Sequence, residues 1–165
     1  MMSNTLNTPA GTKGEYVSPQ AASISVLMAA YNGSRYIRRQ LDSLLGQTVT
    51  GFRIFIQDDC STDGTWDILA EYEQAYPGRF IITRTKKNTG SPKFNFIQLM
   101  INTRDDYLFL SDQDDIWLPD KVEKTLARVM ELERQYGRGT PILVHSDLTV
   151  VNEQLDTISP PFGRP

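Results

Sequence analysis

The sequence predicts a single α/β domain, with a mostly parallel central sheet and helices on both faces. Its 165 residues suffice for one domain with its own core and are few for two. Apolar runs typical of buried strands alternate with segments of helical periodicity, which is the pattern of a parallel sheet. Concentrated polar groups directly follow the strands, at the edge where such sheets bind ligands. Together these observations predict a three-layer α/β/α domain with one site.

The first elements are predicted after a polar lead. Residues 1–22 are rich in Ser, Thr, Asn, Gly and Pro, so we expect them to be disordered and the domain to occupy residues 23–165. The apolar run Ile24–Ala30 predicts a buried strand. The helix that follows carries apolar residues on one face, at Ile37, Leu41, Leu44 and Leu45.

The alternation of strand and helix then repeats along the chain. Four further strands are predicted, at Arg53–Gln57, Phe80–Arg84, Tyr107–Ser111 and Ile142–His145. A second helix would turn Trp66, Leu69 and Tyr72 inward, and a third would span Phe94–Ile101. A fourth, opened by Pro119, would place inward Val122, Leu126 and Val129.

Composition excludes several classes of function. With 17 basic and 20 acidic residues the net charge is −3, which gives no global argument for nucleic acid as a partner. The single cysteine, Cys60, cannot form an internal disulfide and favours a reducing, cytoplasmic setting. The apolar run at 24–30 is too short to span a bilayer, and the N-terminus lacks the features of a secretory signal. Any membrane association is therefore expected to be peripheral, at the inner face.

Three carboxylates follow the strand at Tyr107–Ser111, at Asp112, Asp114 and Asp115. Such like charges repel one another unless a cation lies between them. Oxygen ligands at Asp-x-Asp spacing suit Mg²⁺ or Mn²⁺, which also bind substrate phosphates. The alternative is an acidic loop that caps the next helix, near whose start Asp115 and Asp120 lie. The strand before the cluster and the polar groups after the other strands favour metal binding.

The segment Gln57–Thr65 contains a second candidate site. A carboxylate at the end of a strand can accept a hydrogen bond from the imide N–H that uracil and thymine both carry. The same segment also reads as a turn at Asp63-Gly64 with a helix cap at Thr62 or Asp63. Cys60 is more consistent with a small packing residue than with a nucleophile, because no histidine lies nearby in the sequence.

Weaker candidates have equally simple structural explanations. Tyr31 could stack on a base while Asn32 fixes a turn, or Tyr31 could be a tyrosine of the core or rim. The lysines around Gly90 could approach a diphosphate or be solvated, namely Lys86, Lys87 and Lys93. The only histidine, His145, fits a strand residue better than a ligand.

Three motifs, in order and spacing, resemble those of family-2 glycosyltransferases with the GT-A (Rossmann-like) fold: Ser25–Asn32, Asp58–Thr65 and Asp112–Lys121. The resemblance runs from residue 23 to about residue 160. It implies a site for a nucleotide diphosphate sugar, with the base held by Ala29, Ala30, Tyr31 and Asp59. Asp112 and Asp114 would be the Asp-x-Asp pair that binds Mg²⁺ or Mn²⁺, with Asp114 the direct ligand and Asp112 also near the nucleotide.

A finer likeness concerns the donor sugar. The segments Gly90–Phe96, Asp112–Trp117 and Val144–Leu148 resemble bacterial rhamnosyltransferases of surface-polysaccharide assembly, such as O-antigen synthesis. This implies a dTDP-rhamnose donor, with a UDP-linked sugar as the alternative. The acceptor would be a glycan or a lipid-linked glycan.

The chain is shorter than is usual for this family, whose later part supplies the acceptor site and the base. Asp147, Glu153 and Asp156 lie in no motif that we associate with the base, which we therefore expect beyond Pro165. One alternative is a nucleotide-sugar-binding module without turnover. Another is a Mg²⁺-dependent phosphotransferase with Asp112 as nucleophile and Asp114 as acid, which would need its Asp-x-Asp after the first strand.

Overall fold

The structure, a computed structural model, describes residues 22–159. The predicted disordered lead, residues 1–22, lies outside this range except for its last residue. Ala22 is described, and it packs half-buried against the hydrophobic core. Ala22 therefore belongs to the packed domain.

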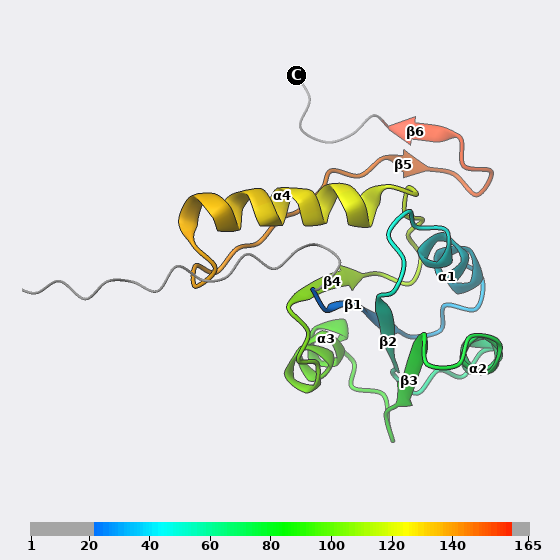
Figure 1. Cartoon of the computed structure of the whole chain (residues 1–165). Coiled ribbons are helices and arrows are strands. Elements are labelled where there is room, and N and C mark those ends of the chain that lie inside the picture. The colour runs from blue at the N-terminus through cyan, green and yellow to red at the C-terminus, as the bar shows by residue number, and fades with distance from the viewer. Residues whose placement is uncertain (1–21, 160–165) are drawn as a thin grey trace, which may run out of the picture.

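Four parallel strands form the central sheet (Figure 1). They are β1 (Ile24–Ala30), β2 (Arg53–Asp58), β3 (Phe80–Arg84) and β4 (Tyr107–Ser111), in the order β3-β2-β1-β4. β1 pairs on both sides, which explains why its sequence is an unbroken apolar run apart from Ser25. β4 has one paired side within the described residues and alternates buried with exposed side chains. Predicted strand bounds are confirmed for β1, β3 and β4, and β2 is one residue longer than predicted.

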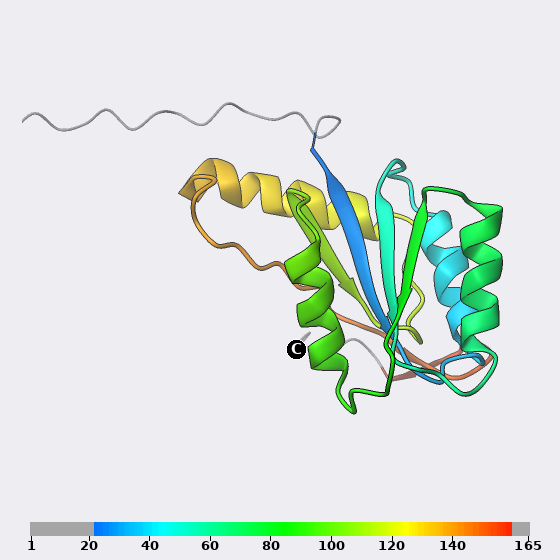
Figure 2. The same ribbon diagram turned by 90° about the horizontal axis from the view of Figure 1, so that it is seen from below.

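Helices cover both faces of this sheet (Figures 1 and 2). α1 (Ile37–Leu45), α2 (Thr65–Ala75) and α4 (Lys121–Tyr136) lie on one face, and α3 (Pro92–Asn102) lies on the other. Successive residues of β1 accordingly pack on opposite faces of the sheet, towards α1, α2 and α4 or towards α3. Val26 and Met28 belong to the core beneath the three helices, while Leu27, equally buried, faces the α3 side. The predicted three-layer α/β/α class is confirmed.

Two details of the helices differ from prediction. α4 begins at Lys121 rather than at Pro119, and its buried face includes Met130 where Val129 was predicted, although Val129 is half-buried. Trp66 on α2 is half-buried rather than internal, with the guanidinium of Arg84 5.0 Å from its ring centroid. α3 extends beyond the predicted Phe94–Ile101 at both ends, since Pro92 is well suited to a first helical turn. No helix within residues 22–159 has the length and apolarity needed to cross a bilayer.

The predicted fifth strand at Ile142–His145 is wrong. Residues 141–149 have no regular secondary structure, and the chain forms instead a short antiparallel pair, β5 (Val150–Val151) and β6 (Thr157–Ser159). An apolar run becomes a strand only when a partner strand satisfies its backbone, and periodicity does not report the partner. The parallel sheet therefore contains four strands among the described residues, not five.

An ion pair between a buried carboxylate and an exposed guanidinium connects the ends of β2 and β3. The carboxylate of Asp58 is fully buried and lies 3.0 Å from Nε of Arg84. Its Oδ2 also accepts the backbone N–H of Ser61, while its Oδ1 has no hydrogen-bond partner in the described structure. Arg84 Nη2 in turn donates to the carbonyl of Ser61. Arg84 thus stabilises both a buried charge and the loop that leaves β2.

Replacing Arg84 with Ala is expected to lower the free energy of unfolding by about 3 kcal/mol, because a buried carboxylate then has no counter-ion. Urea denaturation measures the change. The control is Arg128→Ala, which breaks an exposed ion pair with Glu131 on α4 and is expected to cost less than about 1 kcal/mol. Equal small losses in both variants would contradict a structural role for the Asp58–Arg84 pair.

Candidate functional site

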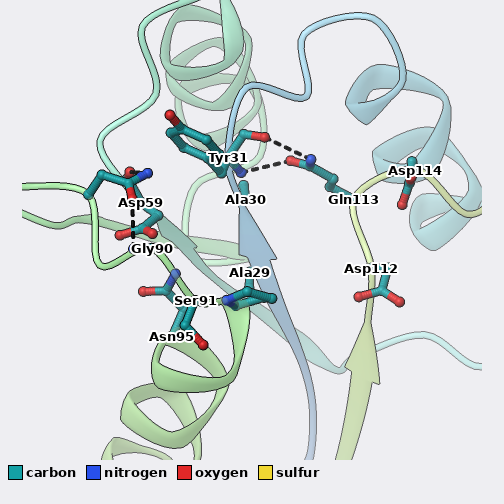
Figure 3. A pocket seen from close by; sticks show the side chains of 12 residues that line it. Ala29, Ala30, Tyr31, Asp59, Gly90, Ser91, Asn95, Asp112, Gln113 and Asp114 are labelled. Atoms are coloured by element: carbon teal, nitrogen blue, oxygen red, sulfur yellow. Dashed lines mark hydrogen bonds between the residues drawn. The ribbon is translucent and has the colours of Figure 1, made fainter.

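A pocket of about 330 Å³ opens at the carboxyl ends of the strands (Figure 3). It is bounded by the end of β1, the residue after β2, the loop from β3 into α3, and the loop after β4. Its lining residues are Ala29, Ala30, Tyr31, Asp59, Asn88, Gly90, Ser91, Pro92, Asn95, Asp112, Gln113 and Asp114. The polar segments that follow β1, β2, β3 and β4 thus gather around one pocket, at the edge of the sheet where the sequence predicted a site.

The loop after β1 forms the centre of the pocket. Figure 3 shows Ala29, Ala30 and Tyr31 between Asp59 and Asn95 on one side and the loop after β4 on the other. The Tyr31 side chain is 46% exposed, so it is not a core tyrosine and its ring is available to a ligand. Asn32 adopts a φ of 47°, and its Oδ1 accepts the backbone N–H of Thr62. This bond gives the Asn32 amide the turn-fixing role that the sequence suggested.

The loops after β1 and β2 are joined by hydrogen bonds from backbone to side chain. The N–H of Asn32 donates to Ser61 Oγ, and the N–H of Gly33 donates to Thr65 Oγ1 at 2.8 Å. The N–H of Ser34 donates to Asp63 Oδ2 at 3.1 Å. Each loop supplies hydrogen-bond partners for backbone N–H groups of the other. These bonds hold the two loops, and the pocket wall beside them, in one arrangement.

Asp63 receives hydrogen bonds from both loops. Its burial would raise its pKa, but the bonds from Thr65 and Ser34 outweigh this effect and lower the pKa from the ordinary value of 3.8 to about 2. A depressed carboxyl pKa contributes stability that is fully present above about pH 4 and is lost as the pH falls towards 2.

The Asp63→Asn variant is therefore expected to be less stable than wild type at pH 7 and to lose less further stability between pH 4 and pH 2. Thermal unfolding across this pH range measures both effects. Asp67→Asn, on α2, is the control, since it removes an exposed carboxylate that makes none of the hydrogen bonds of Asp63. An identical acid slope in wild type and Asp63→Asn would contradict the assignment.

Asp59 follows β2 directly and is only 3% exposed. Its backbone N–H donates to the carbonyl of Ala30 at 2.7 Å, which fixes it beside the end of β1. Its carboxylate accepts the N–H and the hydroxyl of Thr89 and the hydroxyl of Thr85. Desolvation raises the pKa of Asp59, but the hydrogen bonds from Thr89, Asn95 and Thr85 outweigh it and the pKa is lowered. Asp59 is therefore an ionised acceptor in the pocket wall.

Sequence reasoning singled out the lysines of the loop between β3 and α3 and missed two asparagines that line the pocket, Asn88 in this loop and Asn95 in α3. Asn88 donates to the carbonyl of Asp59, and its Oδ1 accepts the N–H of Gly90, whose φ is 71°. Asn95 is 2% exposed and accepts a hydrogen bond of 2.6 Å from Gln57 Nε2. The sequence did carry one signal for Asn95, an amide side chain in the first turns of an amphipathic helix. A buried amide needs hydrogen-bond partners, so such a residue commonly marks a site or a specific contact.

The loop after β4 carries the predicted metal ligands. Asp112 and Asp114 line the pocket with exposed carboxylates, opposite Asp59 (Figure 3). Desolvation and the negative charges of Asp112 and Asp114 raise the pKa of Asp115, although Asp115 as a whole residue is exposed. Negative charge therefore gathers beside the pocket, opposed in part by Lys121, and a bound cation would stabilise it further.

The donor set fits a hard divalent cation. No group of three His, Cys, Asp or Glu side chains within residues 22–159 is placed to hold an ion unaided. Mg²⁺ sites of this type usually take one or two carboxylates and complete their coordination with water and substrate phosphates. Two aspartates at a pocket wall agree with that pattern, and oxygen ligands suit Mg²⁺ and Mn²⁺ alike.

Several predicted candidates lie outside the pocket. Lys93 is exposed on α3 and does not line it, and neither do Lys86 and Lys87. His145 is exposed in the irregular segment after α4 rather than in a strand. Ser146, in the same irregular segment, accepts a hydrogen bond from Lys121 Nζ and does not line the pocket. The pocket is thus formed by the ends of β1, β2 and β4, the loop between β3 and α3, and the start of α3.

Comparison with known proteins shows which family has this arrangement of strands and pocket residues. A family model described as Glycosyl transferase family 2 matches residues 25–142, which include every residue that lines the pocket. The chain belongs to this family. The dTDP-rhamnosyl transferase RfbG of Shigella flexneri is 38% identical over 102 residues, which are 60% of this chain and 35% of RfbG.

Other members of the family agree with this assignment. The putative teichuronic acid biosynthesis glycosyltransferase TuaG of Bacillus subtilis (strain 168) is 35% identical over 108 residues, 66% of this chain and 42% of TuaG. This family-2 chain therefore spans less than half the length of either relative.

Solved structures agree on the GT-A fold. S. aureus TarS 1-349 in complex with UDP-GlcNAc matches with a TM-score of 0.58 and 27% identity, over 66% of this chain and 31% of TarS 1-349. The mannosyltransferase PcManGT from Pyrobaculum calidifontis, in complex with GDP-Man and Mn²⁺, matches with a TM-score of 0.59 and 17% identity, over 64% of this chain and 31% of PcManGT. At that identity the second likeness concerns the fold alone.

Proposed function

We propose that this chain binds a nucleotide diphosphate sugar and forms the donor-binding part of a metal-dependent, inverting glycosyltransferase. The observation that carries the proposal is one pocket with an ionised acceptor, Asp59, on one side and the aspartates Asp112 and Asp114 on the other. A nucleotide diphosphate has the matching chemistry, since its base offers hydrogen-bond donors and its diphosphate is anionic and binds cations.

The base would lie between Tyr31 and Asp59. The Asp59 carboxylate would accept the imide N–H of uracil or thymine, and the exposed Tyr31 ring offers a stacking surface. Thr85 and Thr89 hold the carboxylate in place before the ligand arrives, which lowers the entropic cost of binding. Cytosine has an acceptor where uracil has the imide N–H, so Asp59 should select against it.

The diphosphate would lie towards the loop after β4. Asp112 and Asp114 would hold Mg²⁺ or Mn²⁺ there together with the diphosphate oxygens. When bound, the ion would neutralise the charge that develops on the departing nucleoside diphosphate. Without a cation the two aspartates repel the diphosphate, so their charge makes nucleotide binding depend on the metal.

We further propose rhamnose, carried by dTDP, as the donor sugar and a glycan or lipid-linked glycan as the acceptor. The similarity to RfbG, whose name describes a dTDP-rhamnosyl transferase, supports the donor, and a UDP-linked sugar is the alternative. The single cysteine agrees with action in a reducing compartment, which we propose is the cytoplasm, near the inner face of the membrane.

In an inverting transfer, an acceptor hydroxyl attacks the anomeric carbon, the bond to the diphosphate breaks, and a base takes the hydroxyl proton. The only carboxylates that line the pocket of residues 22–159 are Asp59, Asp112 and Asp114, and each already has another proposed role. We therefore keep the prediction that the base lies beyond Pro165. The same observation favours the second candidate, a chain that binds the donor but does not turn it over alone.

Isothermal titration of dTDP, UDP, GDP and ADP, first with Mn²⁺ and then with EDTA, tests the proposal. We expect dTDP or UDP to bind in the presence of Mn²⁺ and to bind much more weakly in EDTA. ADP is the matched control, since its diphosphate is the same and its base has no imide N–H. Equal binding of all four nucleotides, or no binding by a folded sample, would contradict it.

A further inference from the structure

The side chain of Gln113 connects the segments that follow β1 and β4, beyond the point where the backbone pairing of these two strands ends. β1 and β4 pair in parallel up to Met28 and Ser111. Two residues after Ser111, Gln113 Oε1 accepts the N–H of Tyr31 and Gln113 Nε2 donates to the carbonyl of Tyr31, both at 2.9 Å. Figure 3 shows both bonds. The amide of one side chain thus satisfies both backbone groups of Tyr31, as a peptide group of a neighbouring strand would.

A second observation supports this contact. A Cβ at Gly33 would lie 2.3 Å from Oε1 and 2.5 Å from Cδ of Gln113, closer than real atoms approach. The φ of Gly33 is outside the left-handed region, so its backbone does not require glycine. Gly33 is therefore needed for the space that the Gln113 amide occupies.

Gln113 lies between two of the loop's carboxylates. Asp112 and Asp114 are exposed, and their like charges repel one another unless a cation lies between them. Gln113 is half-buried, and its two hydrogen bonds tie this acidic part of the loop to Tyr31. Its two bonds fix the separation between the base side and the acidic side of the pocket.

We infer that Gln113 is a positioning residue, which holds Asp112 and Asp114 at the pocket before a cation and a diphosphate arrive. The inference rests on the proposed function for its ligands, but the contact itself does not. Gln113 touches neither ligand in this scheme and acts through the backbone of Tyr31.

The first test measures the contact without any ligand. Amide hydrogen exchange at Tyr31, followed by NMR, should accelerate about tenfold in Gln113→Ala because the acceptor of that N–H is removed. The Ile54 amide, which donates to the carbonyl of Arg79, reports global stability and should exchange as in wild type. Unchanged exchange at Tyr31 would overturn the inference, whatever the protein binds.

The second test measures the consequence for binding, as the ratio of UDP or dTDP affinity in Mn²⁺ to that in EDTA. Gln113→Ala should reduce this ratio about tenfold, while the affinity in EDTA changes little. Gln113→Glu separates position from charge, since it adds a negative charge beside the aspartates but places an oxygen against the carbonyl of Tyr31. We expect the ratio to fall in Gln113→Glu also. A ratio equal to or above wild type in either variant would overturn the inference.

A double-mutant cycle gives the third test. Gly33→Ala must displace the Gln113 amide, so it should lower the Mn²⁺-dependent ratio about as much as Gln113→Ala. In the Gln113→Ala background the added methyl meets no amide and should cost nothing further. Additive losses would contradict the inference. If wild type binds no nucleotide at all, the proposed function fails, and the exchange at Tyr31 still decides the role of Gln113.

Discussion

Replacing Asp59 with Asn is expected to weaken UDP or dTDP binding by about 10- to 100-fold and to abolish the preference for UDP over CDP. A hydrogen bond to a charged group contributes about 1.5–3 kcal/mol. Asn offers one acceptor oxygen in place of two, and Thr85 and Thr89 already donate to this position. Competition titrations of UDP and CDP with Mn²⁺ present measure the preference as a ratio, which a partial loss of folded protein does not alter.

The matched control for this variant is Asp63→Asn, four residues along the same loop. Asp63 binds Ser34 and Thr65 rather than lining the pocket. Its substitution should lower stability in the way described above and leave the ratio of UDP to CDP affinity at the wild-type value. A wild-type ratio in Asp59→Asn would place the base somewhere else in the pocket.

Replacing Asp114 with Ala is expected to remove most of the gain in nucleotide affinity that Mn²⁺ provides. Substitutions in the outer shell of a metal site already cost about 10- to 100-fold in metal affinity, so loss of a direct carboxylate should cost at least about 100-fold. In EDTA the variant should bind nucleotide as well as wild type or slightly better, because one charge that repels the diphosphate is gone. Titrations of UDP with and without Mn²⁺ measure both effects.

Asp120→Asn is the control for Asp114→Ala. Asp120 ends the same loop at the start of α4 and pairs with Lys124, outside the pocket. It changes the net charge by the same amount but should leave the Mn²⁺-dependent gain intact. An equal loss in both variants would mean that the ion responds to total charge rather than to a ligand at Asp114.

Most of the sheet could be predicted because its strands have apolar patterns that can be recognised in the sequence. The run Ile24–Ala30 is apolar on both faces, as an interior parallel strand must be, and Tyr107–Ser111 follows a full turn-and-helix unit. Ile142–His145 has the same apolar character, but the prediction of a strand there is wrong, because no strand lies against it among the described residues. Pairing is a tertiary property, which a local pattern does not contain.

The candidate site divides in the same way. Asp59, Asp112 and Asp114 follow strands and are charged, so the rule for strand ends located them, and Tyr31 came with them. Asn95 and Gln113 were missed because their importance lies in contacts with residues far away in sequence. Gln113 bonds to Tyr31 across 82 positions, and Asn95 to Gln57 across 38. Lys93 shows the converse, a charged residue in the first turn of α3 that is exposed and does not line the pocket.

A nucleotide diphosphate is proposed to bind at the carboxyl ends of β1, β2 and β4. The most direct measurement is a map of backbone NMR chemical-shift changes on addition of UDP or dTDP with Mg²⁺, which is diamagnetic. We predict that the largest changes fall in residues 29–31, 59, 88–95 and 112–114. Changes confined to the hairpin at residues 150–159, or scattered weakly over α2 and α4, would contradict the account.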